Sequence, residues 1–432
     1  MNVPSRMTRR SILGGASAAA ATGLLSGCIG SGTTSEPPQS NASTSELTLS
    51  MGFGEPKPRD AIIKVASEYT GGPKITVNAI ATEQLRAQLT TYLTSSSPPD
   101  VIQWLAGSVA RAYAKEGLLL DVSPLWTGDK ACAKLSPALK ALSSDESGKQ
   151  IFVPTSYYWW SIFYKKSAFE KWGLTPPTAW DDFIAMCTEL KGKGIHPLTN
   201  GVGSTPWMSS GWFDYLNLRV NGAPFHRELL AGQHPFTDER VVNVMEKYKQ
   251  IIPFFDPNMR SYSVQEAATP WVQDKSAMYL VGAFITSSVP EDMLDDIDFF
   301  SVPTIDPAIP SAEEAPTDGY FAPARGKNPA ATMDFLNYLA SPAAQQRAIE
   351  LSGSSNLPTS PDVDTSSFSP LVQKGVKLLA ETKEITQFFN RDSSDELQIT
   401  ADAALTKFLD DPSDIPGTLQ KWQTAAEKVF KK

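Results

Sequence analysis

Aromatic residues are concentrated in a run at positions 157–160, Tyr-Tyr-Trp-Trp. An aromatic ring offers a large apolar area and a negative face, which suits stacking on the weakly positive C–H face of a sugar ring. Alternate side chains of a strand share a face. One pair of the run should therefore face a cleft and the other the core, unless all four belong to a core strand. The two pairs are Tyr158 with Trp160 and Tyr157 with Trp159.

Two further tryptophans, Trp207 and Trp212, flank the short segment 208–211. A solvent-facing loop gives a tryptophan little reason to be there without a ligand, so we predict that Trp207 contacts one. Trp212 opens the segment 212–216, whose pattern is helical, and it fits a core position as well as a site.

Carboxylates could turn such an aromatic site into a glycosidase, which needs two of them flanking the scissile bond. Glu55, Asp100 and Asp318 could supply that pair, although Asp100 is better suited to a turn or cap at the start of its strand. The sequence has no Ser-His-Asp ordering, metal motif or phosphate-binding glycine loop. We therefore predict a binding protein with no catalytic residues and no cofactor. A hydrolase would instead shorten oligosaccharides on incubation.

Histidine and cysteine are scarce in this chain. His196, His226 and His234 lack the spacing of metal ligands, so we expect surface or loop residues and no metal site. Cys132 and Cys187 could form a disulfide on the outer face of a membrane, or they could remain two buried free thiols. The sequence leaves both possibilities open.

The N-terminus carries an export signal. Arg6, Arg9 and Arg10 form a positive region, and residues 11–25 are a small and apolar run too short to span a bilayer. The segment 8–13 resembles a twin-arginine signal, which would mean export after folding, and an ordinary Sec signal is the alternative.

A lipid attachment site follows the apolar run. Residues 25–28 read Leu-Ser-Gly-Cys and resemble the bacterial lipoprotein signal, which is cut before the cysteine. We predict that residues 1–27 are removed as a signal peptide and that acylated Cys28 anchors the protein to the lipid bilayer on the outer face of the cell membrane. Residues 28–45 should form a flexible tether, because the segment after Cys28 is rich in Gly, Ser, Thr, Pro and Asn and has little apolar surface to bury.

The net charge and the length of the chain limit which functions and folds the part after the signal peptide can have. The formal charge is −9, and removal of residues 1–27 makes it more negative because three arginines and no acid are lost. Such a surface argues against a nucleic-acid partner. The mature chain, about 400 residues, is too long for one compact core, which suggests two lobes.

Strand and helix patterns alternate at the start of the folded part. The predicted order is strand 47–51, helix 62–69, strand 75–77, helix 85–93 and strand 101–104. This order implies a parallel sheet covered by helices. Ligands of such sheets bind at the carboxyl ends of the strands, which is where Glu55 and Trp104 fall.

The later segments add a crossing and several helices. Residues 151–164 are extended in type and long enough to leave one lobe and enter another. Thr178 is predicted to cap a helix that ends at Gly192 and Gly194. Another helix is predicted to open at 328–329, and Ser341 is predicted to cap a further one with proline in its first turn.

Five blocks, in order along the chain, resemble a known family. They are residues 99–104, 148–154 with 163–174, 175–183, 277–284, and 327–331 through 341–345. Together they resemble the sugar-binding extracellular solute receptors of ABC importers, the group that includes the maltose receptor. The resemblance covers nearly the whole mature chain. It implies an α/β fold of the periplasmic-binding-protein type, with two lobes, a hinge and a central cleft.

The resemblance also implies domains and partners. Lobe one would comprise residues 46–155 and 298–345, and lobe two 156–297 and 346–432. The partners would be a carbohydrate ligand, mono- or oligosaccharide, and the membrane permease subunits of an ABC importer, with the receptor itself a monomer. A receptor for a non-sugar solute, such as a peptide or polyamine, is the alternative binding function.

Several site residues are implied by the resemblance alone. Within the run 157–160 it favours Tyr158 and Trp160 as ligand contacts. It places Phe284, where the family often has tryptophan, at the sugar. It adds three further cleft residues, namely Asp318, Tyr320 and Arg391.

Overall fold

The computed structural model describes residues 46–53 and 56–431, which all belong to one compact unit, Ser43–Lys432. The predicted signal peptide 1–27, Cys28, the tether 28–45 and Glu55 lie outside the described residues. In the described part of the chain, the helices are all too short or too polar to cross a membrane.

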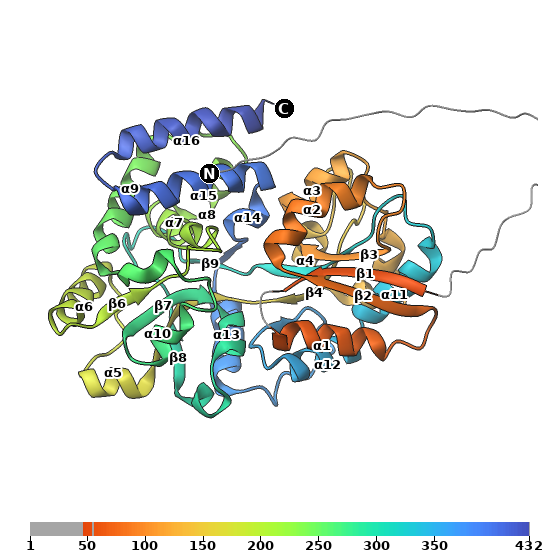
Figure 1. Cartoon of the computed structure of the whole chain (residues 1–432), viewed down its shortest axis with the longest axis horizontal. Helices are drawn as coiled ribbons and strands as arrows, with labels where there is room; N and C mark the ends of the chain where they lie inside the picture. The colour runs from red at the N-terminus through yellow and green to blue at the C-terminus, as the bar shows by residue number, and fades with distance from the viewer. Residues whose placement is uncertain (1–45, 54–55, 432) are drawn as a thin grey trace, which may run out of the picture. The chain divides into compact units, whose positions relative to one another are not determined.

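A six-stranded sheet has the strand order β11-β4-β10-β3-β1-β2. Figure 1 labels four of its strands, β1, β2, β3 and β4. Its strands are β1 (Glu46–Gly52), β2 (Lys74–Ile80), β3 (Val101–Leu105), β4 (Val153–Tyr157), β10 (Thr317–Phe321) and β11 (Leu357–Pro358). β1 pairs in parallel with both β2 and β3, which confirms the parallel unit expected from the alternating pattern. β10 is antiparallel to β3 and β4, and β11 is antiparallel to β4, so the complete sheet is mixed.

Helices cover this sheet through regularly spaced apolar residues. They are α1 (Pro56–Ser67), α2 (Thr82–Thr94), α3 (Ser108–Lys115), α4 (Pro137–Leu142), α11 (Pro329–Leu339) and α12 (Pro342–Ser352). Leu85, Leu89 and Leu93 of α2 recur every four residues and are fully buried. The predicted cap of α12 is confirmed, because the Ser341 side chain accepts a hydrogen bond from the backbone N–H of Ala344.

Asp100 has the structural role expected of it. Its Oδ2 accepts hydrogen bonds from the backbone N–H of Thr48 and from the Thr48 hydroxyl, at 2.8 and 2.9 Å. These contacts fix the start of β3 against β1.

A four-stranded sheet, with the order β6-β7-β5-β8, forms the second part. Its strands are β5 (Trp160–Lys165), β6 (His196–Thr199), β7 (Ser276–Gly282) and β8 (Ile297–Phe300). A two-stranded ribbon joins β9 (Ala312–Glu314) to β12 (Glu384–Thr386). Besides α11 and α12, the helices that follow β5 are α5 (Lys166–Trp172), α6 (Trp180–Gly192), α7 (Met208–Val220), α8 (Gly222–Leu230), α9 (Glu239–Ile251), α10 (Ala268–Val272), α13 (Pro370–Glu381), α14 (Phe389–Asp392), α15 (Asp395–Asp410) and α16 (Ile415–Phe430). Short 3₁₀ turns lie at Ser123–Trp126, Ala131–Lys134, Ile252–Phe254, Pro257–Arg260, Ala283–Ser288 and Glu291–Asp296.

The long segment 151–164 crosses between the sheets, as predicted, but as two strands. β4 belongs to the six-stranded sheet. β5, which follows β4 after two intervening residues, belongs to the four-stranded sheet. The expected boundary at 298 falls inside β8, which pairs with β5. The expected boundary at 345 falls inside α12. The division into two lobes at these residues stays a proposal.

The predicted cap at Thr178 is wrong. α6 begins at Trp180 after Ala179, and no side chain caps it. Thr178 instead takes part in a backbone bridge, in which its carbonyl accepts from the N–H of Thr304 while the Thr304 carbonyl accepts from the N–H of Trp180. Because Thr304 already satisfies an N–H of the first turn, α6 begins without a side-chain cap. The helix ends at Gly192, as expected.

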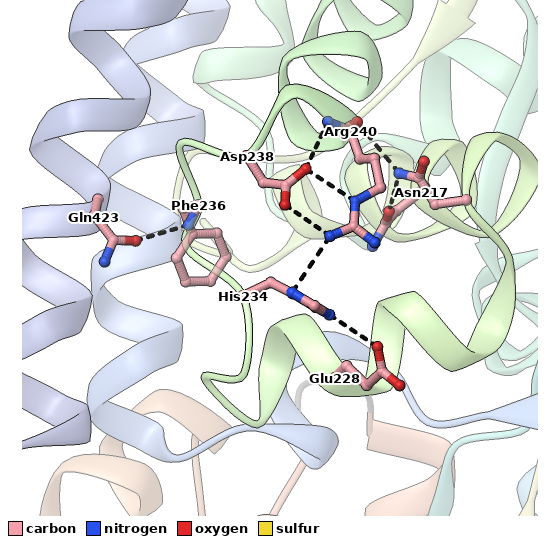
Figure 2. Close-up of polar contacts among 8 residues, drawn as sticks. Asn217, Glu228, His234, Phe236, Asp238, Arg240 and Gln423 are labelled. Carbon is pink, nitrogen blue, oxygen red and sulfur yellow. Dashed lines mark hydrogen bonds and ion pairs between the residues drawn. The ribbon is translucent and has the colours of Figure 1, made fainter.

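A polar network holds the segment between α8 and α9 (Figure 2). Asp238 caps α9 by accepting from the backbone N–H of Arg240, and its carboxylate also binds the Arg240 guanidinium at 2.7 Å. His234 lies between Arg240 and Glu228. The expected loop position of His234 is therefore confirmed.

The other histidines and the cysteines are placed differently. His226 is wholly buried on α8, so the expectation of a surface or loop position is wrong for it. Its helix packs that face against α7, which local spacing could not reveal. His196 is half-buried in β6. Cys132 and Cys187 are both free and buried, which decides between the two possibilities left open by the sequence.

Candidate functional site

A cavity of about 230 Å³ lies at the carboxyl ends of β1 and β3, where parallel sheets bind their ligands. Gly52 and Phe53 line it from the end of β1, and Trp104 lines it from β3. Trp207 and Phe284 line it from segments around the four-stranded sheet. The cavity is thus built by parts of the chain that belong to two different sheets.

Eight of the nine predicted ligand-binding residues line this one cavity. They are Trp104, Tyr158, Trp160, Trp207, Phe284, Asp318, Tyr320 and Arg391. The ninth, Glu55, lies outside the described residues, two positions after Phe53, which lines the cavity. Their convergence comes from the crossing of the chain between β4 and β5, and from the return of β10 beside β3.

Aromatic rings form one wall of the cavity. Trp160 stacks on Phe388, with ring centroids 4.6 Å apart and an angle of 23° between the planes. Trp207 meets both of these rings edge to face. Tyr158 packs its edge against Phe284 at 5.2 Å. Such edge-to-face and stacked pairs hold each other in place, so the wall is a rigid surface.

The aromatic run divides only in part as the alternation predicts. Tyr158 and Trp160 line the cavity, but they are only 6% and 1% exposed and also pack in the core. Trp159 is fully buried and packs against Phe299, whereas Tyr157 is half-buried. Trp212 is likewise a core residue, 1% exposed and packed against Phe183. Of the two tryptophans flanking 208–211, only Trp207 lines the cavity.

Two glycines allow this wall to form. A Cβ on Gly282 would lie 2.5 Å from the ring of Phe284 and 2.7 Å from that of Tyr158. A Cβ on Gly211 would lie 2.8 Å from the ring of Trp160. All three distances are too short for a Cβ contact, so the rings pack directly on the glycine backbone.

Arg391 forms the polar centre of the site. Its guanidinium binds Oδ1 of Asp318 at 2.8 Å, donates to the Tyr158 hydroxyl at 2.7 Å, and donates to the Thr317 carbonyl at 2.9 Å. Burial alone would lower the pKa of Arg391, but Asp318 and Tyr158 more than offset this effect and raise it. Burial also raises the pKa of Tyr158. Arg391 is therefore cationic, Tyr158 is neutral, and Asp318 balances the charge.

A second arginine at the cavity, Arg86, is also paired. Its Nη1 lies 2.6 Å from Oδ1 of Asp395, and its guanidinium lies over the ring of Trp104 at 5.3 Å from the centroid. Tyr113 donates to the other oxygen of Asp395 at 2.8 Å. Both arginines among the described lining residues thus have a carboxylate partner, and the described site has balanced charges.

Buried polar atoms without partners belong to four of the lining side chains. Within the described residues, no hydrogen bond is made by Nε1 of Trp104, Nε1 of Trp160, Nε of Arg391 or Oδ1 of Asn390. Three of these atoms are donors and one is an acceptor. Buried polar atoms usually have partners. These four are covered by protein atoms, so a ligand rich in hydroxyl groups could pair with them only after the lining side chains move.

The sequence did not identify Phe388, Arg86 or Gln103, which also line the cavity. Asn390 lines it too, and it lies in the segment 389–392 that the family resemblance places at the cleft. Gln103 is a polar residue between the apolar Ile102 and Trp104, near the carboxyl end of β3. A polar side chain at this place in a buried strand was a signal from which a site residue could have been predicted. Its Oε1 accepts from the N–H of Gly52 at 3.3 Å and so fixes the end of β1.

The carboxylates do not form a hydrolytic pair in the described residues. Asp318 pairs in register with Leu105 at the carboxyl end of β3, whereas Asp100 precedes the start of that strand. Five strand residues separate the two by roughly 15 Å. They cannot flank one glycosidic bond, for which inverting enzymes need about 6.5–9.5 Å.

Two α/β sheets joined by crossing strands, with an aromatic cavity at the strand ends, define the class of solute-binding proteins. The family model for bacterial extracellular solute-binding proteins matches residues 55–346, more than half of the chain. The chain therefore belongs to this family.

Relatives share this assignment at modest identity. An uncharacterised ABC transporter extracellular-binding protein of Pyrococcus horikoshii is 25% identical over 62% of this chain and 66% of its own. A probable sugar-binding periplasmic protein of Rhizobium meliloti is 23% identical over 68% of this chain and 70% of its own. The diacetylchitobiose-binding protein NgcE of Streptomyces coelicolor is 24% identical over 65% of this chain and 62% of its own. These matches span about two thirds of each relative's length, and the names describe binding proteins rather than enzymes.

Solved structures agree with the fold. The bacterial solute receptor AcbH, described as having an exclusive preference for β-D-galactopyranose, has a TM-score of 0.84 and 26% identity, over 89% of this chain and 99% of its own. A maltose-bound MalE3 of T. maritima has a TM-score of 0.73 and 14% identity over 89% and 99%. The predicted two-lobe fold of the periplasmic-binding-protein type is thereby confirmed.

Proposed function

We propose that this protein is the extracellular receptor of an ABC importer and that it binds a sugar, a mono- or oligosaccharide, in the cavity between its two sheets. The observation that carries the proposal is a cavity lined by aromatic rings, among them the half-buried Trp207 and Phe284, beside the polar groups of Asp318 and Arg391. Rings stack on the C–H faces of a pyranose, and the polar atoms meet its hydroxyl groups.

Charge supports a neutral ligand. Arg86 and Arg391 are each paired with a carboxylate, Asp395 and Asp318 respectively. A cationic ligand such as a polyamine would need an unpaired carboxylate, and an anionic one an unpaired arginine. The described lining offers neither, which favours a sugar over the alternative solutes.

Size favours a short sugar. The cavity of about 230 Å³ is below the range of roughly 300–1,000 Å³ typical of drug-sized ligands. A receptor with 26% identity, AcbH, is described as preferring a single pyranose. We therefore place one or two sugar rings in the site.

The proposed place of the receptor is the outer face of the cell membrane, beside its importer. Acylated Cys28 would hold the receptor on the outer face of the cell membrane, and the tether 28–45 would let the folded part reach the permease subunits of the importer. The name of the Pyrococcus horikoshii relative supports an ABC transporter as the partner. Loaded receptor would act as a monomer in this delivery.

Thermal unfolding against a panel of sugars tests the binding function. A ligand at 100 times its Kd adds about 2.7 kcal/mol of stability, so a cognate monosaccharide should raise the melting temperature clearly. Titration calorimetry would then give the affinity. A polyamine or peptide that stabilises the protein, with no effect of any neutral sugar, would contradict the proposal. Product analysis of incubated oligosaccharides should show no shortening, and shortening would identify a hydrolase.

A further inference from the structure

A second group of chemically active side chains lies away from the cavity. Asp214 on α7, His226 on α8 and Glu314 on β9 are all fully buried. One ligand-type atom of each lies within 4.8 Å of those of the other two. None of the three lines the cavity described above.

The atoms at the centre of this cluster lack partners. Within the described residues, no donor reaches Oδ1 of Asp214 or either carboxylate oxygen of Glu314, and Nε2 of His226 makes no hydrogen bond. The carboxyl groups of Asp214 and Glu314 lie within hydrogen-bonding reach of each other, but they can bond only if one of them carries a proton. The outer atoms are held: Oδ2 of Asp214 accepts from the N–H of Phe389 at 2.8 Å, and Nδ1 of His226 lies 3.2 Å from the Asn217 amide. The outer atoms of Asp214 and His226 are thus fixed by neighbouring groups, and the inner atoms of all three side chains face a small polar centre.

Charge in this region is not balanced by the protein. The nearby Arg219 is committed to Glu313, at 2.6 Å, and to the carbonyls of Val302 and Ala312. Asp214 and Glu314 thus have no arginine or lysine ion pair among the described residues. Burying unpaired carboxylates is costly, so either a bound cation or a proton must neutralise them.

We propose that Asp214, His226 and Glu314 hold one divalent transition-metal ion, of which Zn²⁺ is the best match. Imidazole nitrogen and carboxylate oxygen are both common ligands of Zn²⁺. Ca²⁺ and Mg²⁺ take oxygen ligands and favour sites without imidazole. Three protein ligands leave a fourth position, which the second oxygen of Glu314 or a water molecule would fill.

The distances between the three side chains predict how they must move when Zn²⁺ binds. A tetrahedral Zn²⁺ with bonds of about 2.0–2.2 Å holds its ligand atoms roughly 3.3 Å apart. The three ligand atoms lie within 4.8 Å of one another, so binding draws them together by at most about 1.5 Å. A ligating imidazole that binds through Nε2 donates from Nδ1. The Asn217 amide beside Nδ1 can present its oxygen and accept that proton. The adjacent Asn221, which contacts the same amide, would turn with it.

The ion would have a structural role. It would tie α7, α8 and β9 together from inside and, through the bond from Phe389 to Asp214, would also position α14. This inference does not rest on the sugar-binding function, since metal content can be measured without any sugar.

The first test uses the mature wild-type chain. We would unfold it in denaturant that contains a chelator and refold it in metal-free buffer. Melting temperature and bound metal would then be measured after adding Zn²⁺, Ca²⁺ or Mg²⁺. About one Zn²⁺ per chain, with a higher melting temperature and no effect of Ca²⁺ or Mg²⁺, is expected. A metal-free chain whose melting temperature Zn²⁺ leaves unchanged would overturn the proposal in favour of a proton shared between Asp214 and Glu314. Selective stabilisation by Ca²⁺ or Mg²⁺ would also overturn it.

The second test uses variants with a matched control. Glu314→Gln and His226→Gln should lose the bound Zn²⁺ and the visible absorption of a Co²⁺-substituted site. His234→Gln, which removes a histidine outside the cluster, should keep both. Equal retention of metal in all three variants would show adventitious binding elsewhere and would overturn the proposal. If the cluster variants do not fold, the wild-type measurements alone decide.

Discussion

Trp207 and Trp212 allow a sharp test of the site, because two tryptophans five positions apart have opposite surroundings. Trp207 precedes α7, is half-buried and lines the cavity, with its ring edge to face against Trp160 and Phe388. Trp212 lies within α7 and is 1% exposed in the core. We expect Trp207→Ala to act on binding and Trp212→Ala to act on stability.

The magnitudes follow from these surroundings. Removing a ring that stacks on a sugar should cost about 1–3 kcal/mol of binding free energy, which is roughly a 5- to 150-fold rise in Kd. A partly exposed ring leaves only a small interior cavity, so Trp207→Ala should change the melting temperature little. Truncating the core ring of Trp212 should instead cost about 3–5 kcal/mol of unfolding free energy.

The assay needs ligand-free protein, since a sugar retained through purification would mask a change in affinity. Each variant should be unfolded, dialysed and refolded before calorimetric titration with the sugar found by thermal screening. Circular dichroism would give the melting temperature. A Trp207→Ala variant with a much lower melting temperature but unchanged affinity would assign Trp207 to the core and refute the site. Tyr158 is less suitable for this test, because it is 6% exposed and bonded to Arg391, so its loss should reduce stability as well.

Three further outcomes are expected. Arg391→Gln should destabilise the fold by up to about 3–5 kcal/mol in urea unfolding because it leaves Asp318 without its partner, and adding Asp318→Asn should restore part of that loss; full additivity would contradict the pairing. Hydrogen bonding to Arg240 lowers the pKa of Asp238 to about 2, so this pair stabilises the fold above about pH 4 and the contribution is lost as pH falls towards 2. Asp238→Asn, which can still cap α9, should flatten that part of the pH dependence measured by urea unfolding, and an unchanged profile would argue against the pair. Cys28→Ala should release the protein from membranes, and unchanged detergent partitioning would count against lipid attachment.

The sequence predicted those strands and helices that are long enough to show their own apolar periodicity. Leu47 and Leu49 alternate in β1, and Leu85, Leu89 and Leu93 recur on one face of α2, so period and burial agree. β9, β11 and β12 escaped prediction because strands of two or three residues carry no period. Their pairing partners lie far away in the chain, as in β12 with β9, and no local signal specifies such a contact.

The site residues also fall into those that local sequence could predict and those that it could not. The expected alternation set Tyr158 and Trp160 apart from Trp159, and the family resemblance added Asp318 and Arg391. Phe388 could not be found, because its stacking on Trp160 depends on the position of α14 after more than two hundred intervening residues. The buried cluster was missed for the same reason, since its members come from three separate elements and each looks ordinary in its own segment.

The four-residue helix α14 links these features. Arg391 on this helix binds Asp318 of β10 in the six-stranded sheet, while the N–H of Phe389 is held by Asp214 of α7. Phe388, just before the helix, supports Trp160 at the start of β5. A helix this short has little stability of its own, so its position must come from these contacts. Sugar affinity should therefore depend on residues that never touch the sugar. A change at Asp214 that shifts α14 would move Arg391 and the aromatic wall together.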